Sequence, residues 1–225
     1  MNAKKLSAVS ALLESISRED SAIHLYNRQY HRDPFASVPF TPLYYVLDEM
    51  YFLKASPINL VDLLGIVEVE IEHKRRFTEA AKEMNPSGEP VAKVQFPEDL
   101  FETISIPEVD PIPGMKTAIQ VVVTDHVQEQ RARLIYDYFT KETSGPVSDL
   151  FREIADQELA HRRIFERALQ DLQSNRKINM FCPVCGKVLE LRPEDGFLSG
   201  CAFCNSRLIL KIEDDDFVLH LREEK

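Results

Sequence analysis

Two short motifs each occur twice in this chain, and this repeat constrains the fold more than any other feature. The motif E-x-x-A-x-x-x-Y begins at Glu19 and again at Glu129. The motif E-x-x-H-x-R-x-F begins at Glu70 and again at Glu158. Residues three apart lie on the same face of an α-helix, so each motif predicts a helix that presents polar ligands on one side. We therefore predict a mainly α protein built on a four-helix bundle.

Apolar periodicity predicts four long helices, at about residues 3–31, 58–84, 115–143 and 146–174. A further helix is expected at 41–53, within an insertion at 33–57 that lengthens the first copy of the repeat. Residues 85–113 contain six of the thirteen prolines and no sustained periodicity. One long connection between two helical hairpins is typical of ferritin-like bundles. We expect residues 1–175 to form such a bundle, with 85–113 as its crossover.

The repeated carboxylate and imidazole side chains are candidate ligands for two metal ions. They are Glu19, Glu70, His73, Glu129, Glu158 and His161. Glu70 and His73 can reach one ion, Glu158 and His161 the other, and carboxylates can bridge the two. A single E-x-x-H is usually a solvent-exposed face, but here each motif is embedded in an apolar stripe, where an unpaired carboxylate would be costly. Oxygen ligands with few nitrogens suit iron or manganese.

Tyr26 and Tyr136 follow their glutamates by seven residues, which places each pair on the same helix face. Each phenol either hydrogen-bonds a ligating carboxylate, as a candidate catalytic residue, or is a core aromatic with a satisfied hydroxyl. Ala22 and Ala132 leave room either for helix packing or for a ligand at the metals. Other polar residues near the motifs are expected to lie outside the ligand set: Glu68, Glu72, Arg75, His126 and Arg163.

All four cysteines lie in the tail, residues 178–225, which we expect to be a second, β-rich module with strands near 187–191, 207–212 and 217–221. They form two C-x-x-C pairs, Cys182 with Cys185 and Cys201 with Cys204, separated by fifteen residues. Four thiolates at this spacing fit Zn²⁺ or a single iron, and a pair of disulfides is the alternative. The tail is too short to fold on a hydrophobic core alone, so a metal is expected to stabilise it.

Charge and composition exclude several classes of protein. The net charge of −10 argues against a nucleic-acid partner, which needs clustered Lys and Arg. No stretch approaches the roughly 20 apolar residues of a membrane span, and residues 1–10 lack the pattern of a secretion signal. No cysteine remains outside the tail for a disulfide framework. We therefore expect a cytoplasmic protein without a membrane partner.

The repeated motifs followed by paired cysteines resemble rubrerythrin. The resemblance covers about residues 7–32, 58–84, 115–174 and 178–221. It implies that the six bundle residues hold a non-haem diiron site that reduces hydrogen peroxide or reacts with dioxygen. It also implies that Cys182, Cys185, Cys201 and Cys204 hold a rubredoxin-like metal that relays electrons from an electron-donor protein, and that the chain is a homodimer.

Some features depart from the rubrerythrin pattern. Rubrerythrins commonly have a further glutamate one turn after the third-helix ligand, where this chain has Ala132. The resulting six-ligand set is similar to the symmetric ferroxidase centre of bacterioferritin. Asn205 replaces the glycine expected after the second cysteine pair, which favours zinc there, and the insertion at 33–57 could cover the site or form an interface.

A diiron oxidoreductase is therefore the leading hypothesis for the function of this chain. The alternatives are a ferroxidase or iron-storage protein, and a zinc-ribbon adaptor carried by a metal-stabilised bundle.

Overall fold

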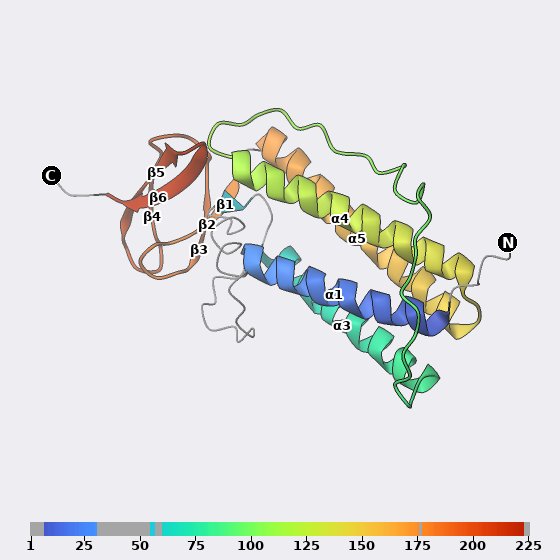
Figure 1. Cartoon of the computed structure of the whole chain (residues 1–225). Coiled ribbons are helices and arrows are strands. Elements are labelled where there is room, and N and C mark those ends of the chain that lie inside the picture. Colours follow the sequence, from blue (N-terminus) through green and yellow to red (C-terminus); the bar gives the residue numbers. More distant parts are fainter. Residues whose placement is uncertain (1–6, 31–54, 57–59, 176, 223–225) are drawn as a thin grey trace. The chain divides into compact units, whose positions relative to one another are not determined.

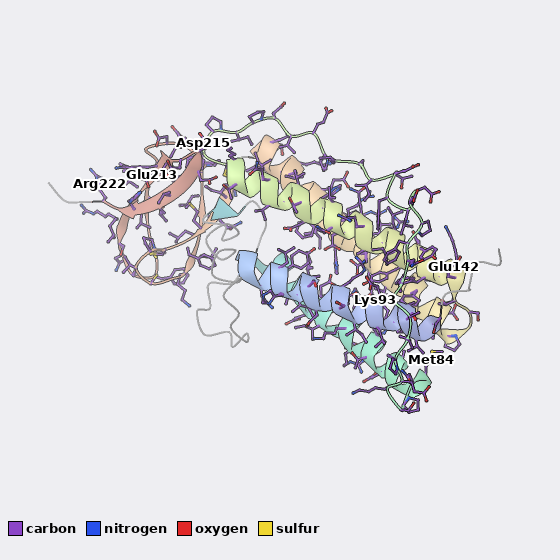
Figure 2. All side chains as sticks on the ribbon, viewed as in Figure 1. Met84, Lys93, Glu142, Glu213, Asp215 and Arg222 are labelled. Atoms are coloured by element: carbon purple, nitrogen blue, oxygen red, sulfur yellow. The ribbon has the colours of Figure 1, made fainter. Side chains whose placement is uncertain are left out.

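The structure is a computed structural model that describes residues 7–30, 55–56, 60–175 and 177–222. It contains four long helices (Figure 1): α1 (Ala8–Tyr30), α3 (Leu60–Met84), α4 (Lys116–Glu142) and α5 (Pro146–Asn175). Figure 2 labels Met84 and Glu142, the last residues of α3 and α4. The four helices predicted from the sequence are confirmed. The helix predicted at 41–53 lies outside the described residues, as does most of the insertion at 33–57.

The helix ends follow from the local sequence. α3 ends at Met84, just before Asn85 and Pro86, because proline disfavours a helical conformation in the residue that precedes it. A tight turn joins α4 to α5, and Gly145 adopts a φ of 63° there, which favours glycine. Pro146 then opens α5, at a position where its missing N–H costs no helical hydrogen bond.

The chain divides into two compact units, of which the first contains Met1–Asn27, Leu64–Ile106 and His126–Arg163. All four long helices contribute to its apolar core: Ala11, Leu12, Phe77, Ala81, Ile135, Tyr136, Phe139, Phe151, Ile154 and Ala155. Aromatic rings at the centre of this core lie with centroids 5.1–6.1 Å apart. Burying a large apolar side chain contributes roughly 1.5–3 kcal/mol, so this core holds the helices together beside the repeated motifs.

The crossover from α3 to α4 belongs to the first unit as far as Ile106, and this part of it packs on the helices. Its residues Val94, Phe96, Leu100 and Phe101 contact the apolar core. Gln130 of α4 fixes the end of this segment: its Nε2 donates to the carbonyl oxygen of Ser105 at 2.7 Å, and its Oε1 accepts from the Ser105 amide and hydroxyl, both at 3.2 Å. The predicted crossover is therefore confirmed, and its residues between Val94 and Ser105 are anchored to the helices.

The second unit contains Arg28–Leu63, Pro107–Asp125 and Ile164–Lys225, and its described strands form two antiparallel sheets. One sheet has the order β1 (Ala55–Ser56), β2 (Ile178–Phe181), β3 (Val188–Leu191). The other has the order β4 (Leu198–Gly200), β5 (Arg207–Glu213), β6 (Asp216–Leu221). The predicted β-rich module is confirmed, although sequence reasoning missed β1, β2 and β4. The boundary predicted between the bundle and this module, near residue 176, stays a prediction.

The β5–β6 hairpin caps the N-terminus of α4 within the second unit. Asp216 Oδ1 accepts a hydrogen bond of 2.9 Å from the amide of Thr117, and the Thr117 hydroxyl donates to Asp216 Oδ2. The amide of Phe217 donates to the carbonyl of Gly114 at 2.7 Å. Asp215, labelled in Figure 2, lies in the turn of this hairpin. Asp216 therefore serves as the cap of a helix that begins 100 residues earlier in the sequence.

Candidate metal centres

The six predicted ligands of the repeated motifs converge in the first unit. Glu19 comes from α1, Glu70 and His73 come from α3, Glu129 comes from α4, and Glu158 and His161 come from α5. All six side chains are buried, with exposed fractions of 5% or less. Their ligand atoms form two groups, within each of which all atoms lie within 4.8 Å of one another: Glu19, Glu70, His73 and Glu158; and Glu70, Glu129, Glu158 and His161.

Glu70 and Glu158 belong to both groups and divide their oxygens between the two histidines. Oε2 of Glu70 lies 3.5 Å from Nδ1 of His73, and its Oε1 lies 2.8 Å from Nδ1 of His161. Oε1 of Glu158 lies 3.2 Å from Nδ1 of His73, and its Oε2 lies 3.8 Å from Nδ1 of His161. Each carboxylate thus has one oxygen in each group, which is the arrangement of a carboxylate that bridges two cations.

Glu19 and Glu129 each face one histidine and are held by the tyrosine of the opposite copy. Oε2 of Glu19 lies 3.7 Å from Nδ1 of His73, and Oε2 of Glu129 lies 3.6 Å from Nδ1 of His161. The Tyr136 hydroxyl donates to Oε1 of Glu19 at 2.5 Å, and the Tyr26 hydroxyl donates to Oε1 of Glu129. Of the two roles left open for these tyrosines, the structure therefore shows the hydrogen bond to a candidate ligand.

In the absence of cations, the four buried carboxyl groups of the cluster have different pKa values, because hydrogen bonds outweigh the effect of burial at only some of them. Burial and the nearby Glu70 raise the pKa of Glu19 well above its usual value, and burial and the nearby Glu158 raise that of Glu129. Burial also acts to raise the pKa of Glu70, but its hydrogen bonds with Glu19 and His161 outweigh burial and lower it. Burial and the charge of Glu70 act to raise the pKa of Glu158, but its hydrogen bonds with His161, His73 and Glu129 outweigh them and lower it. The two carboxylates that belong to both ligand groups therefore keep their charge most readily.

The two histidines have raised pKa values for a related reason. Burial alone would lower the pKa of His73, but its contacts with Glu158 and the other carboxylates raise it to about 12. The pKa of His161 is likewise raised, because its interactions with carboxylates outweigh burial. Without metal, both rings are thus imidazolium ions that partly neutralise the buried carboxylates.

Several polar atoms at the centre of this cluster have no hydrogen-bond partner of acceptable geometry among the described residues. They are Oε1 of Glu70, Oε2 of Glu129, Oε1 of Glu158, and Nδ1 of His73 and His161. A buried polar atom without a partner costs about 1–3 kcal/mol. All five atoms belong to the two ligand groups, so a pair of cations would satisfy them together. The residues present therefore fit a dinuclear metal centre.

Sequence reasoning missed one residue of this site, Gln157. Its Oε1 lies 2.5 Å from Nε2 of His73, so the ring donates a proton there and directs Nδ1 toward the carboxylates. Outer hydrogen bonds of this kind fix the orientation and tautomer of histidine ligands. The corresponding position of the first copy is Val69, so comparing the copies gives no signal for Gln157.

A cavity of about 400 Å³ reaches the carboxylates between α1 and α4. Its inner lining includes all four glutamates of the cluster, together with Tyr26 and Tyr136. Ala22 and Ala132 also line it, one helical turn beyond Glu19 and Glu129. The two alanines therefore leave open space beside the candidate ligands.

The residues expected outside the ligand set lie outside both groups. Glu68, Glu72, Arg75 and Arg163 are exposed, and Arg75 forms ion pairs with Glu72 and Glu79. His126 is buried, but its Nδ1 lies 3.2 Å from Nε2 of Gln130, in the hydrogen-bond network that fixes the crossover.

The four cysteines form a third group of candidate ligands, in the second unit. The Sγ atoms of Cys182 and Cys204 lie 3.7 Å apart, and those of Cys185 and Cys201 lie 3.6 Å apart. All four are free thiols, so the disulfide alternative is not supported. Four sulfurs placed tetrahedrally about 2.3 Å from a zinc ion lie about 3.8 Å from one another. The cysteine spacing therefore fits a tetrahedral four-thiolate centre.

The two C-x-x-C turns have the same backbone geometry. The amide of Gly186 donates to the carbonyl of Cys182 at 2.9 Å, and that of Asn205 donates to the carbonyl of Cys201 at 2.8 Å. The φ angles of Gly186 and Asn205 are 70° and 58°. Asparagine is among the few residues besides glycine that adopt this conformation readily. Asn205 therefore preserves the turn, and its presence no longer favours zinc over iron.

Ser206 is a second residue that sequence reasoning missed. Its Oγ lies 3.1 Å from Sγ of Cys204. Hydrogen bonds from the Ser206 hydroxyl and backbone lower the pKa of Cys204 to about 6. Because the thiolate is the metal-binding form of cysteine, Ser206 favours metal binding at this position.

Within the described ranges, none of the helices combines the length and apolar character needed to cross a membrane.

A comparison with protein families relates part of the chain to a known family. The family model for rubrerythrin matches residues 126–194. This segment contains Glu129, Glu158 and His161 of the second copy and the first pair of cysteines. No curated protein and no solved structure matches the chain. The internal repeat relates the ligands of the first copy, which lie outside the matched segment, to those within it.

Proposed function

We propose that this rubrerythrin-like chain is a non-haem diiron oxidoreductase that reduces hydrogen peroxide or dioxygen. The observation that carries this proposal is the division of the Glu70 and Glu158 oxygens between two ligand groups, beside a cavity that reaches both carboxylates. Two ferrous ions bound there would supply two electrons and act as Lewis acids on the O–O bond. Manganese suits the same ligands, and metal analysis distinguishes the two.

The tyrosines contribute hydrogen bonding at the cavity. Burial, together with the charge of Glu19, raises the pKa of Tyr136 well above its usual value, so this phenol stays protonated. Both Tyr136 and Tyr26 line the cavity while donating to a terminal carboxylate. We propose that they hold Glu19 and Glu129 in place. Because each phenol donates its single proton to a carboxylate, its oxygen can accept a hydrogen bond from a protonated oxygen atom that enters the cavity.

The cysteine centre is the proposed route for electrons. If it holds iron, an electron-donor protein can reduce it, and the bundle receives electrons from it one at a time. If it holds zinc, it only stabilises the module. We propose a redox-active iron, in a cytoplasmic homodimer, on the basis of the rubrerythrin resemblance. A visible absorption spectrum of protein purified without added metal tests this, because iron in a four-thiolate site is red and zinc is colourless.

The proposed activity is tested by adding hydrogen peroxide to the anaerobic protein loaded with ferrous iron and measuring the rate of iron oxidation. We expect oxidation much faster than that of free ferrous ion, and loss of this rate in Glu70→Ala and Glu158→Ala. Glu72→Ala is the matched control, because Glu72 is exposed on the same helix as Glu70. Oxidation of the wild-type protein at the rate of the free ion would exclude the proposal.

A ferroxidase is the second candidate, favoured by Ala132. The cavity lining has an alanine one turn after Glu129, so the ligand set among the described residues has six members and is symmetric between the copies. A ferroxidase would oxidise ferrous iron and retain the ferric product. Size-exclusion chromatography with iron analysis distinguishes the two functions: a large iron-filled assembly supports storage, whereas repeated turnover with a reductant supports the oxidoreductase.

A further inference from the structure

The cavity beside the dinuclear centre is larger than hydrogen peroxide or dioxygen requires. Its volume is about 400 Å³, whereas a molecule of the size of water takes up about 30 Å³. Cavities that bind organic ligands usually have volumes of about 300–1,000 Å³. Even with two metal ions bound at its inner end, the cavity has room for an organic molecule.

The walls of the cavity change in character from the inside outward. The cluster carboxylates and the tyrosines line its inner end. Ala22, Leu25 and Ala132 provide apolar surface along its length. Ser17, Ser21 and Gln128 also line it, and all three are exposed. An elongated ligand would therefore have one end at the metal centre, an apolar middle, and a polar end near solvent.

Two arginines line the cavity and are held by the crossover. The guanidinium of Arg18 lies 5.1 Å from the ring centroid of Phe96, and that of Arg131 lies 5.0 Å from that of Phe101. Arg18 already forms an ion pair of 2.6 Å with Glu14. In the part of the chain that the structure describes, Arg131 has no ion-pair partner. Arg131 therefore offers its N–H groups to an anion, in a position that stacking on Phe101 restricts.

The loaded metal centre would not repel such an anion. The charges of four carboxylates and two divalent cations cancel, so the net charge at the cavity comes from its outer residues. Of these, Arg18 and Glu14 neutralise each other, and Arg131 is left as a cation. Guanidinium groups bind carboxylates through paired, charge-assisted hydrogen bonds.

We propose that this cavity binds an organic hydroperoxide that carries a carboxylate, with the carboxylate at Arg131 and the O–O bond at the metal centre. This inference rests on the proposed function and names its substrate class. In the reaction the O–O bond of the hydroperoxide breaks, and the organic oxygen leaves as an alcohol while the outer oxygen leaves as water. Two protons come from solvent, and two electrons come from the oxidation of two ferrous ions to ferric ions.

Binding can be measured without turnover, in protein whose bundle site is loaded with redox-inert zinc. The probe is hexanoate, with hexanamide as its uncharged counterpart, in isothermal titration calorimetry. We expect hexanoate to bind more tightly than hexanamide, and Arg131→Gln to weaken hexanoate about tenfold or more. Arg133→Gln is the matched control: Arg133 lies two residues further along α4, pairs with Asp137 at 3.6 Å, and does not line the cavity.

A second variant tests the cavity itself. Ala132→Leu fills the space beside Glu129 and should abolish hexanoate binding, while zinc analysis and circular dichroism check that the fold and the metal content are intact. Equal affinities for hexanoate and hexanamide, or an unchanged affinity in Arg131→Gln, would overturn the inference.

The binding experiment and the oxidation experiment distinguish a wrong substrate class from a wrong activity. If hydrogen peroxide oxidises the diferrous protein rapidly but hexanoate does not bind, the substrate class is wrong and the oxidoreductase stands. If hexanoate binds as expected but no peroxide oxidises the diferrous protein, the hydroperoxide assignment fails together with the proposed function.

Discussion

The hydrogen bonds from Tyr26 and Tyr136 cross between the two copies of the repeat, and this crossing gives each tyrosine a measurable role. Tyr136 lies on α4 with Glu129, yet it donates to Glu19 of α1. Each copy thus fixes the terminal carboxylate of the other. Removing one phenol should therefore disturb one of the two metal positions and leave the other in place.

Tyr136→Phe tests this arrangement. The variant leaves Oε1 of Glu19 without its donor, which should destabilise the metal-free fold by about 1–3 kcal/mol in urea unfolding. It should also weaken binding of one metal ion more than the other in a calorimetric titration. Tyr138→Phe is the control, because Tyr138 lies on the same helix and packs edge-on against Phe96. Equal effects of the two substitutions would contradict the role given to Tyr136.

The raised pKa values of the two histidines predict that metal binding depends on pH. His73, with its pKa raised to about 12, and His161, with its pKa also raised, are both protonated at neutral pH in the metal-free protein. A metal ion binds only the neutral ring, so the metal competes with the proton and binding strengthens as pH rises. If each ion displaces one proton, affinity should fall about a hundredfold from about pH 8 to about pH 6.

Proton release measured with a pH indicator in weak buffer, during addition of zinc, checks this directly. We expect release of at least one proton per ion bound in the bundle. The control is the same titration with His73→Ala and His161→Ala, in which this release should fall. An affinity that is the same at both pH values would show that the histidines are already neutral.

At the scale of elements, the helices could be predicted and the strands only in part. Amphipathic periodicity, with proline or glycine at the ends, marks α3 and α5 clearly. β1 and β4 have only two and three residues, too few for an alternating pattern to show, and β1 is defined only by its pairing with β2. Long-range contacts of this kind leave no local signal in the sequence.

The turn after each cysteine pair gives a prediction about backbone conformation. Gly186 and Asn205 both have positive φ, where most side chains are strained. Asn205→Gly should leave the module unchanged, whereas Asn205→Val should destabilise it by about 1–2 kcal/mol. Competition for the bound metal with a chelating dye measures this as a loss of metal retention. If valine is tolerated as well as glycine, the conformation of this turn does not limit metal binding.

The cap of α4 gives a prediction that depends on two distant segments. Asp216→Ala removes the acceptor for the Thr117 amide and hydroxyl, and should lower the free energy of unfolding by about 0.5–2 kcal/mol. Asp216→Asn keeps an oxygen in the same place and should lose less. Urea unfolding followed by circular dichroism compares the variants. A loss as large with asparagine as with alanine would indicate that the charge, rather than the cap, is what matters.

At the scale of the whole molecule, the repeat predicted which candidate ligands come together, because each copy supplies the same residues to a shared cluster. Asymmetric features could not be predicted this way: Gln157 matches Val69 of the other copy, and Gln130 matches Asp20. Gln157 orients a histidine and Gln130 anchors the crossover, and each depends on a neighbour that only the fold brings close. Comparison of the two copies within the chain therefore finds the candidate ligands but not the residues that hold them in position.

The metal content of the chain follows from its groups of candidate ligands. Three groups of candidate ligands predict three ions per chain, two in the bundle and one at the cysteines. Because Glu158 belongs to both bundle groups, Glu158→Ala should remove both bundle ions and leave about one ion per chain, whereas Glu19→Ala should remove only one. Cys182→Ser should leave the two bundle ions in place. Elemental analysis after dialysis measures these contents. A Glu158→Ala protein that retains one bundle ion would show that this carboxylate is a ligand to a single metal. The contacts of its two oxygens with His73 and His161 would then belong to the metal-free protein only.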